Sequence, residues 1–157
     1  AQIDRFANVN STGIGDYERP KARLPGSGGT NDIAPHAKKV LIIPRHEKRR
    51  FPQRRDFLTT PGYLPRPEGR RHAGLPVPYP DIHVFPDREV MSIDKAEGRL
   101  RLAKLMPGVS LDEVRQITGF DLPVDAPPSQ VAPPSSRELR LLREKVDPSG
   151  VYLKGAP

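Results

Sequence analysis

Residues 24–44 read LPGSGGTNDIAPHAKKVLIIP, and this stretch decides the fold. A glycine-rich loop over residues 25–30 leads into a short helix that we expect over residues 32–39. The continuous apolar run that follows, residues 39–43, predicts a strand buried on both faces. Residues 22–25 are expected to lead into the loop as an earlier strand. The order strand, loop, helix and strand is βαβ-like and predicts an open mixed or parallel sheet of the α/β class.

Local signals define the start of the helix and the segment before it. Asn31 and Asp32 are both good N-cap residues, and either is expected to cap the helix. Pro35 would then fall in the first turn, where a missing N–H is harmless. Further towards the N-terminus, residues 1–12 predict an edge strand and Gly13–Asp16 predicts a turn.

Beyond the apolar run the chain alternates between irregular and regular segments. Residues 59–80 are rich in proline and glycine and predict a long irregular loop, of a kind that is usually functional or in contact with a subunit. Residues 81–85, 90–93 and 100–103 are expected to form a small antiparallel meander. The sequence SLDE from Ser110 is a capping box, which predicts a helix that ends before Gly119.

The last part of the chain is expected to be separate from the α/β domain, which we place at residues 1–122. Residues 123–157 contain a proline-rich linker over 123–134 and a second capping box from Ser135. A short helix should follow and dock onto another surface, because isolated helices of this length are marginal. Its apolar stripe consists of Leu139, Leu142 and Val146.

Composition excludes several classes of protein. The 157 residues include no cysteine, which excludes a disulfide framework, cysteine-ligated metal and a cysteine nucleophile. Only 35% of the residues are hydrophobic and no apolar run approaches a membrane span. The chain begins without a methionine or a signal-peptide pattern. We therefore expect a cytoplasmic protein without a membrane segment, whose reading frame extends beyond this sequence.

The formal net charge of +7 comes from two segments, residues 45–55 and 66–71. Such a focused positive charge attracts anions, and arginine matches phosphate oxygens in pairs. Nucleic acid, a phosphorylated ligand and an acidic partner all fit, and a solvated or subunit-facing loop is the alternative. The candidate anion-binding residues are Arg45, Lys48, Arg49 and Arg50.

The glycine-rich loop is the strongest candidate for chemistry. Glycines let a ligand approach the backbone closely, and a helix N-terminus behind them adds positive potential for an anion or oxyanion. The alternative is a tight turn between a strand and a helix. The loop is not a nucleotide-binding P-loop, because no Gly-Lys-Ser/Thr follows. Its candidate residues are Gly26, Ser27, Gly28, Gly29 and Asn31.

His46 and Glu47 directly follow the apolar run, at the carboxyl end of a strand where α/β sheets bind ligands. They are the candidates for acid–base catalysis. The alternative is that His46 closes the end of the strand and Glu47 pairs with an arginine. The four histidines lack metal-ligand spacing and no serine lies in a nucleophile elbow, so we expect no metal and no nucleophile within this chain.

Taken together, these segments resemble the β subunit of class I coenzyme A transferases, particularly the glutaconate CoA-transferase type. The resemblance implies an open α/β fold, an α-type partner subunit and an active site between subunits. It implies an acyl-CoA thioester as substrate without a permanently bound cofactor, and it places Gly26, Gly28 and Gly29 at the thioester. The matching motifs are LPGSGGTNDIA (24–34), KKVLII (38–43), RHEKRRF (45–51), DFLTTPGY (56–63), PGVSLDEV (107–114) and TGF (118–120).

One feature of the family is absent from this sequence. The family nucleophile is a glutamate in a Ser-Glu-Asn-Gly-like turn in the first half of the subunit, and no such turn occurs here. The chain therefore resembles only the later, C-terminal part. Either the first half with its glutamate is another polypeptide, or it was lost, or this chain is a family member that does not need it.

Three alternatives to a transferase remain open. Subunits of steroid-ring-degrading CoA-ester hydrolases, which cleave a ring C–C bond, are also similar, and a missing glutamate turn favours that role and would engage His46 or Glu47. A non-catalytic scaffold is a second alternative. A basic nucleic-acid-binding module is a third, although an aromatic content of 6% weighs against it.

Overall fold

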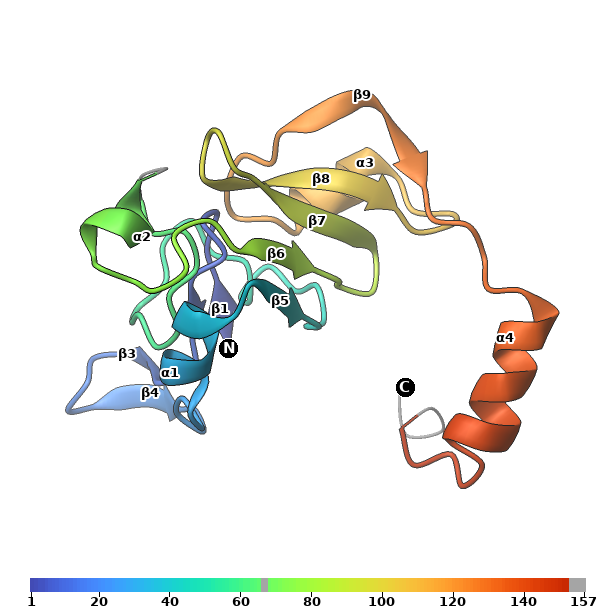
Figure 1. Cartoon of the computed structure of the whole chain (residues 1–157), viewed down its shortest axis with the longest axis horizontal. Coiled ribbons are helices and arrows are strands. Elements are labelled where there is room, and N and C mark those ends of the chain that lie inside the picture. Colours follow the sequence, from blue (N-terminus) through green and yellow to red (C-terminus); the bar gives the residue numbers. More distant parts are fainter. Residues whose placement is uncertain (66–67, 153–157) are drawn as a thin grey trace.

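A five-stranded mixed sheet forms the centre of the computed structural model, which describes residues 1–65 and 68–152 (Figure 1). β5 is parallel to β6, β9 is parallel to β8, and β6, β7 and β8 form an antiparallel meander. This arrangement confirms the predicted open mixed sheet and the predicted meander. The strands, in spatial order, are β5 (Lys39–Ile42), β6 (Asp81–Val84), β7 (Glu89–Asp94), β8 (Arg99–Leu105) and β9 (Val124–Gln130).

The core lies against one face of this sheet. Burial alternates along β6, where Ile82 and Val84 are buried while Asp81 and His83 are partly exposed. Alternation of this kind is typical of a sheet with one covered face. The cluster is completed by residues from the N-terminal segments and α3. Its buried members are Ile3, Ala7, Phe51, Tyr63, Ile82, Val84, Met91, Leu100, Leu102, Leu105, Val114, Phe120 and Leu122.

Two small sheets precede the main one. β1 (Gln2–Ile3) pairs with β2 (Val9–Asn10), so the predicted edge strand over residues 1–12 is two short strands. β3 (Gly13–Gly15) pairs with β4 (Pro20–Arg23). The predicted turn at Gly13–Asp16 is therefore wrong, because its glycines lie in a strand and the chain reverses after them.

The predicted βαβ-like unit is also wrong, because β4 pairs only with β3 and does not join the sheet that contains β5. α1 (Thr30–His36) lies between them and begins earlier than predicted. Its N-cap is Gly29 at φ 91°, without a side-chain cap, so neither Asn31 nor Asp32 caps it. Pro35 lies near the end of the helix rather than in its first turn. The loop glycines, whose positive φ values suit residues without a Cβ, set the start of this helix.

β5 forms one edge of the main sheet instead of a strand buried on both faces. Val40 and Ile42 pack against the core, whereas Leu41 is 57% exposed and Ile43, the next residue after the strand, is 82% exposed. The predicted strand is present, and the predicted burial on both faces is wrong. The apolar run has only one of its two faces covered by the described part of the chain.

The loop over residues 59–80 is anchored to the body by two buried side chains. Tyr63 donates a hydrogen bond to the carbonyl of Pro80 at 3.0 Å. Arg70, in the one-turn helix α2 (Gly69–His72), is fully buried. Burial lowers the pKa of its guanidinium. It ties the end of α1 to this loop by donating to the carbonyls of Ala34, Pro35, Pro61, Gly62 and Val77. Arg70 therefore acts inside the fold, although the sequence placed it in a charged surface segment.

β9 forms the other edge of the main sheet, and α3 packs into the core through Val114. The predicted capping box of α3 (Leu111–Gln116) is confirmed, with Ser110 and Glu113 bonded reciprocally. The first part of the predicted linker is β9, paired in parallel with β8. Prolines fit there because an edge strand has one side without ladder hydrogen bonds.

The C-terminal arm stands clear of the rest of the molecule (Figure 1). It consists of α4 (Ser136–Leu141), which continues into the π-helical turn η1 (Leu142–Val146). The predicted capping box of Ser135 and Glu138 is confirmed. Docking of this arm onto another surface stays a prediction. Across residues 1–65 and 68–152, no helix has the length and apolar character that crossing a membrane requires.

Candidate functional site

A cleft of about 540 Å³ lies between the glycine-rich loop, α1 and β5. Consecutive residues of β5 line it, and successive side chains of a strand point to opposite faces. The cleft therefore follows the outer edge of β5 rather than one face of the sheet. Its lining residues are Val9, Ser11, Gly26, Ser27, Thr30, Ile33, Ala34, Ala37, Lys39, Val40, Leu41, Ile42, Ile43 and Thr60.

The backbone amides of the glycine-rich loop divide into two groups. The amide of Gly26 donates to the carbonyl of Ser11 at 2.7 Å and so fixes the start of the loop. The amides of Ser27, Gly28 and Gly29 form no hydrogen bond with any residue that the structure describes. Three consecutive donors are thus unpaired, and unpaired donors of this kind suit an oxyanion. Ser27 lines the cleft, whereas Gly28 and Gly29 are not among its lining residues.

The glycines leave open space around these amides. Gly26 and Gly28 adopt φ values of 85° and 54°, and a Cβ built at either position would meet no atom within 4 Å. Packing against the described residues therefore does not require glycine at these two positions. The positive φ favours glycine, and the lack of a side chain also leaves the loop amides open to a ligand.

Hydroxyl groups hold the end of the loop near the cleft. Thr30 Oγ1 donates to the carbonyl of Ser27 at 2.7 Å and lies 2.6 Å from Thr60 Oγ1. Asn31 is exposed on α1 and does not line the cleft. Because α1 is only seven residues long, the predicted contribution of its N-terminus is small beside that of the loop amides.

His46 lies inside the fold, away from the cleft. Its Nδ1 is 2.6 Å from Oε1 of Glu89, and both side chains are fully buried. Thr118 Oγ1 donates to the carbonyl of Val114, so His46 Nε2–H donates to Thr118 at 3.2 Å. Nδ1 forms a hydrogen bond with Oε1 of Glu89, and the ring packs on Phe51 with centroids 4.3 Å apart. This geometry favours a structural role, in which His46 joins the end of β5 to β7 and α3. The catalytic role of His46 stays a prediction, and the position of this residue away from the cleft does not support it.

Glu47 and two of the predicted anion-binding residues pair with one another. Glu47 contacts Arg49 at 2.5 Å and Arg50 at 3.3 Å, and the Arg49 hydrogen bond holds the pKa of Glu47 below its usual value. Arg49 and Arg50 line a second cavity of about 560 Å³, separate in its lining from the loop cleft. Arg45 and Lys48 are exposed and have no acidic partner among residues 1–65 and 68–152. The alternative in which Glu47 pairs with arginine is therefore the arrangement observed.

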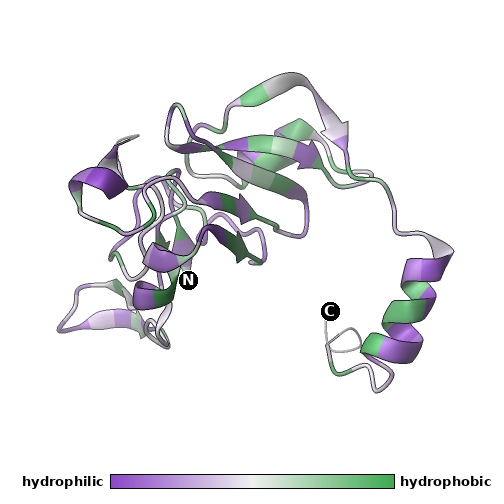
Figure 2. Ribbon diagram, in the orientation of Figure 1, coloured by the Kyte–Doolittle hydropathy of each residue, from purple (hydrophilic) through white to green (hydrophobic). Residues whose placement is uncertain are grey.

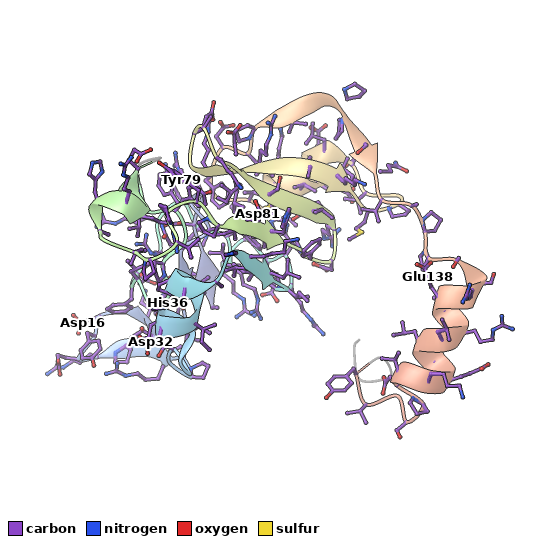
Figure 3. The ribbon with its side chains drawn as sticks, in the orientation of Figure 1. Asp16, Asp32, His36, Tyr79, Asp81 and Glu138 are labelled. Atoms are coloured by element: carbon purple, nitrogen blue, oxygen red, sulfur yellow. The ribbon has the colours of Figure 1, made fainter. Side chains whose placement is uncertain are left out.

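Acidic residues and histidines do not cluster as metal ligands in the described part of the chain. His36 illustrates this: it lies exposed on α1, and its Nδ1 contacts the carbonyl of Asp32 at 2.8 Å (Figure 3). Sequence reasoning missed several cleft residues, such as Ser11, Ile33 and Thr60. Only the fold brings these residues together, and no local motif marks them.

Comparison with known proteins places the chain in a family. The coenzyme A transferase family model matches residues 1–116, so the chain belongs to the coenzyme A transferase family. The chain is 39% identical to the B-type subunit of glutaconate CoA-transferase from Acidaminococcus fermentans, over 98% of its length and 57% of that protein. The crystal structure of glutaconate coenzyme A-transferase from that organism gives a TM-score of 0.91 over the whole chain and 59% of its counterpart.

Two other relatives are similar over most of the chain. One is the B-type subunit of 3-oxoadipate CoA-transferase from Pseudomonas knackmussii, 37% identical over 91% of the chain and 55% of that protein. The other is a cholesterol ring-cleaving hydrolase IpdB subunit of Rhodococcus jostii, 27% identical over 94% of the chain and 57% of that protein. The chain thus spans little more than half the length of the curated relatives it matches.

Proposed function

We propose that this chain is the loop-bearing part of a B-type subunit in a heteromeric CoA transferase, which moves CoA between an acyl-CoA and a carboxylic acid. Two B-type relatives of CoA transferases, at 39% and 37% identity, support this assignment. The proposed partners are an α-type subunit and the remaining, N-terminal part of the B-type subunit. The cytoplasmic location expected from the sequence stays a prediction.

The loop amides are proposed to stabilise the oxyanion of the acyl-CoA thioester. When a carboxylate attacks the thioester carbon, the carbonyl oxygen becomes an oxyanion and the CoA thiolate then leaves, with an acyl anhydride as product. The amides of Ser27, Gly28 and Gly29 would donate to that oxygen. The single observation that supports this role is that all three amides lack a partner among the described residues, in a loop whose Ser27 lines an open cleft.

The rest of the machinery is proposed to lie outside this chain. A glutamate from the remaining part of the subunit would supply the attacking carboxylate. The CoA thiolate would then attack the glutamyl carbonyl of the anhydride, which forms a glutamyl thioester and releases the acyl group as a free carboxylate. Arg45 and Lys48, which are exposed and unpaired within the described residues, would attract CoA phosphates or substrate carboxylates.

The hydrolase alternative receives weaker support than the transferase. The IpdB relative is 27% identical, against 39% for the glutaconate CoA-transferase relative. The hydrolase role was expected to engage His46 or Glu47; His46 is buried against Glu89, and neither residue lines the cleft.

A side chain at Gly28 tests the loop assignment in the complete assembly. Gly28→Val should lower kcat for CoA transfer by about 100-fold, as expected when an oxyanion donor is lost, because the added side chain blocks approach to the amides. Gly108→Val is the matched control, because Gly108 also has a positive φ and open space around its Cβ but lies outside the glycine-rich loop. Steady-state kinetics and melting curves of both variants give the comparison. Equal activity of the two variants would refute the loop assignment.

A further inference from the structure

We propose that Thr60 is a positioning residue for the glycine-rich loop and acts through the hydroxyl of Thr30 to fix the direction of the Gly28 amide. Among the three unpaired amides, Gly28 is then the donor whose direction the fold sets. This inference rests on the proposed function of the loop, and it adds the residues that orient the oxyanion donor.

The peptide between Ser27 and Gly28 is held by its carbonyl. The carbonyl of Ser27 accepts two hydrogen bonds from Thr30, one from the amide at 2.9 Å and one from Oγ1 at 2.7 Å. In a planar trans peptide, the carbonyl and the amide of the next residue point in opposite directions. The amide of Gly28 therefore points away from Thr30, and it has no partner among the residues that the structure describes.

The neighbouring peptides of the loop lack this restraint. Within residues 1–65 and 68–152, the carbonyls of Gly26 and Gly28 accept no hydrogen bond. These carbonyls belong to the same peptides as the amides of Ser27 and Gly29. A side chain therefore orients the Gly28 amide, whereas the other two amides depend on the backbone of the loop alone.

Thr60 controls the hydroxyl of Thr30. The two Oγ1 atoms lie 2.6 Å apart. A hydroxyl has one proton, and Thr30 donates its proton to Ser27, so Thr60 is the donor to Thr30. This bond holds the exposed Thr30 in the side-chain conformation that reaches the Ser27 carbonyl. We call the bonds from Thr60 through Thr30 to Ser27 the hydroxyl relay.

The backbone of Thr60 is fixed to the body of the molecule. Thr60 is buried, and its amide and carbonyl pair with the carbonyl and amide of Val9 in β2, each at 2.9 Å. Thr59 Oγ1 accepts from the amide of Ser11, whose carbonyl accepts from the amide of Gly26. The two threonines therefore anchor both the start and the end of the loop.

The surroundings favour hydrogen bonds among these hydroxyls. Ser27, Thr30 and Thr60 line a cleft whose other walls include the hydrophobic residues of β5 (Figure 2). Polar groups beside apolar surface bond to one another more strongly than they do in water. The cleft therefore strengthens the hydroxyl relay.

Kinetics of the complete assembly test the relay. Thr60→Val keeps the shape of the side chain and removes the donor, and it should lower kcat for CoA transfer by about ten-fold with little change in KM. The loss is smaller than for Gly28→Val, because the Gly28 amide is misaligned rather than blocked. Thr60→Ser keeps the hydroxyl and should retain the wild-type kcat.

A double variant shows whether Thr60 acts through Thr30. Thr30→Val, at an exposed position, should lower kcat by a similar factor without disturbing the core. Thr60→Val should have no further effect in the Thr30→Val background, because both changes break the same relay.

Ser110→Ala is the control for a loss of stability alone. It removes the capping hydroxyl of α3, which lies outside the loop, and should lower the melting temperature while kcat stays at the wild-type value. Melting curves of all variants separate a change in stability from a change in kcat.

Three results would overturn the proposal. Thr60→Val keeps the full kcat while Gly28→Val loses it, or Thr60→Ser loses as much kcat as Thr60→Val. Alternatively, the effects of Thr60→Val and Thr30→Val multiply in the double variant, which would mean that Thr60 acts independently of Thr30. A wild-type kcat in Gly28→Val would instead refute the proposed function of the loop, and this inference with it.

Discussion

β5 and β9 are the two edges of one sheet, and they differ in the features that decide whether an edge accepts another strand. Both are parallel to their neighbours. β5 is short and mostly apolar, with no proline. β9 contains Pro127 and Pro128, which cannot donate to a ladder, and its exposed Ser129 and Gln130 are polar. Proline on an edge strand is a common protection against further pairing.

This difference divides the molecule into a closed side and an open side. The closed side is the meander β6–β8 with α3 and β9, whose core residues are buried by elements of the chain itself. The open side consists of α1, the glycine-rich loop and β5, where apolar residues remain exposed. The sheet is protected at one edge and remains able to pair at the other, which is the arrangement expected of part of a larger subunit.

Arg70 gives the largest expected effect, because it ties the open side to the body. Arg70→Met removes the donors for five backbone carbonyls and should lower the free energy of unfolding by about 3 kcal/mol or more. Denaturant unfolding measures the loss. In this variant, hydrogen exchange should show that the amides of α1 and β5 lose protection before those of β7 and β8, because the open side then unfolds while the closed side stays folded.

Arg71→Met is the control for Arg70. Arg71 lies in the same turn of helix, is exposed and contacts Glu68 at 3.7 Å, so its loss should hardly change stability. Equal destabilisation by the two variants would show that burial of Arg70 is not what holds α1. Simultaneous loss of protection in β8 would remove the distinction between the two sides.

His46 gives the next largest effect, because it joins the end of β5 to the closed side. His46→Ala leaves Glu89 buried without its partner and should cost about 3 kcal/mol of stability. Glu47→Ala, one residue away, should leave stability nearly unchanged, because Glu47 contacts only surface arginines. Thermal or denaturant unfolding of both variants separates the structural from the catalytic hypothesis. A stable His46→Ala variant that has lost CoA transfer in the assembly would restore the catalytic prediction.

Local signals in the sequence predicted the closed side well. The capping box at Ser110 and the meander depend on neighbours within a few residues, and both are present. The pairing of β9 and the buried hydrogen bonds of Arg70 and His46 were not predicted. His46 and Glu89 are 43 residues apart, and no local pattern links residues at that distance.

The open side was predicted wrongly for a different reason. The apolar run of β5 is typical of a strand covered on both faces, and the described chain covers only one. Sequence pattern reflects the environment in which a segment functions, whereas the structure contains this chain alone. The cleft walls at Ser11 and Thr60 were missed because only the fold places them beside the glycine-rich loop.

Tyr63 gives the smallest expected effect and tests the junction between the two sides. Its hydroxyl donates a hydrogen bond to the carbonyl of Pro80, just before β6. This bond connects the loop that contains Arg70 to the meander. Burial raises the pKa of Tyr63 from 10.0 to about 12. Between these values the unfolded chain releases the phenolic proton while the folded chain retains it. The stability that Tyr63 contributes is therefore complete below pH 10 and is lost as the pH rises towards 12.

The phenylalanine variant isolates this contribution. Tyr63→Phe removes one hydrogen bond and should cost about 1 kcal/mol at neutral pH. Its free energy of unfolding should also fall less steeply than that of the wild type above pH 10, because one group no longer titrates. Chemical denaturation across this pH range gives both curves. Parallel curves would mean that the hydroxyl ionises alike in the folded and unfolded chain, and the loop would then be held to β6 by packing and by Arg70 alone.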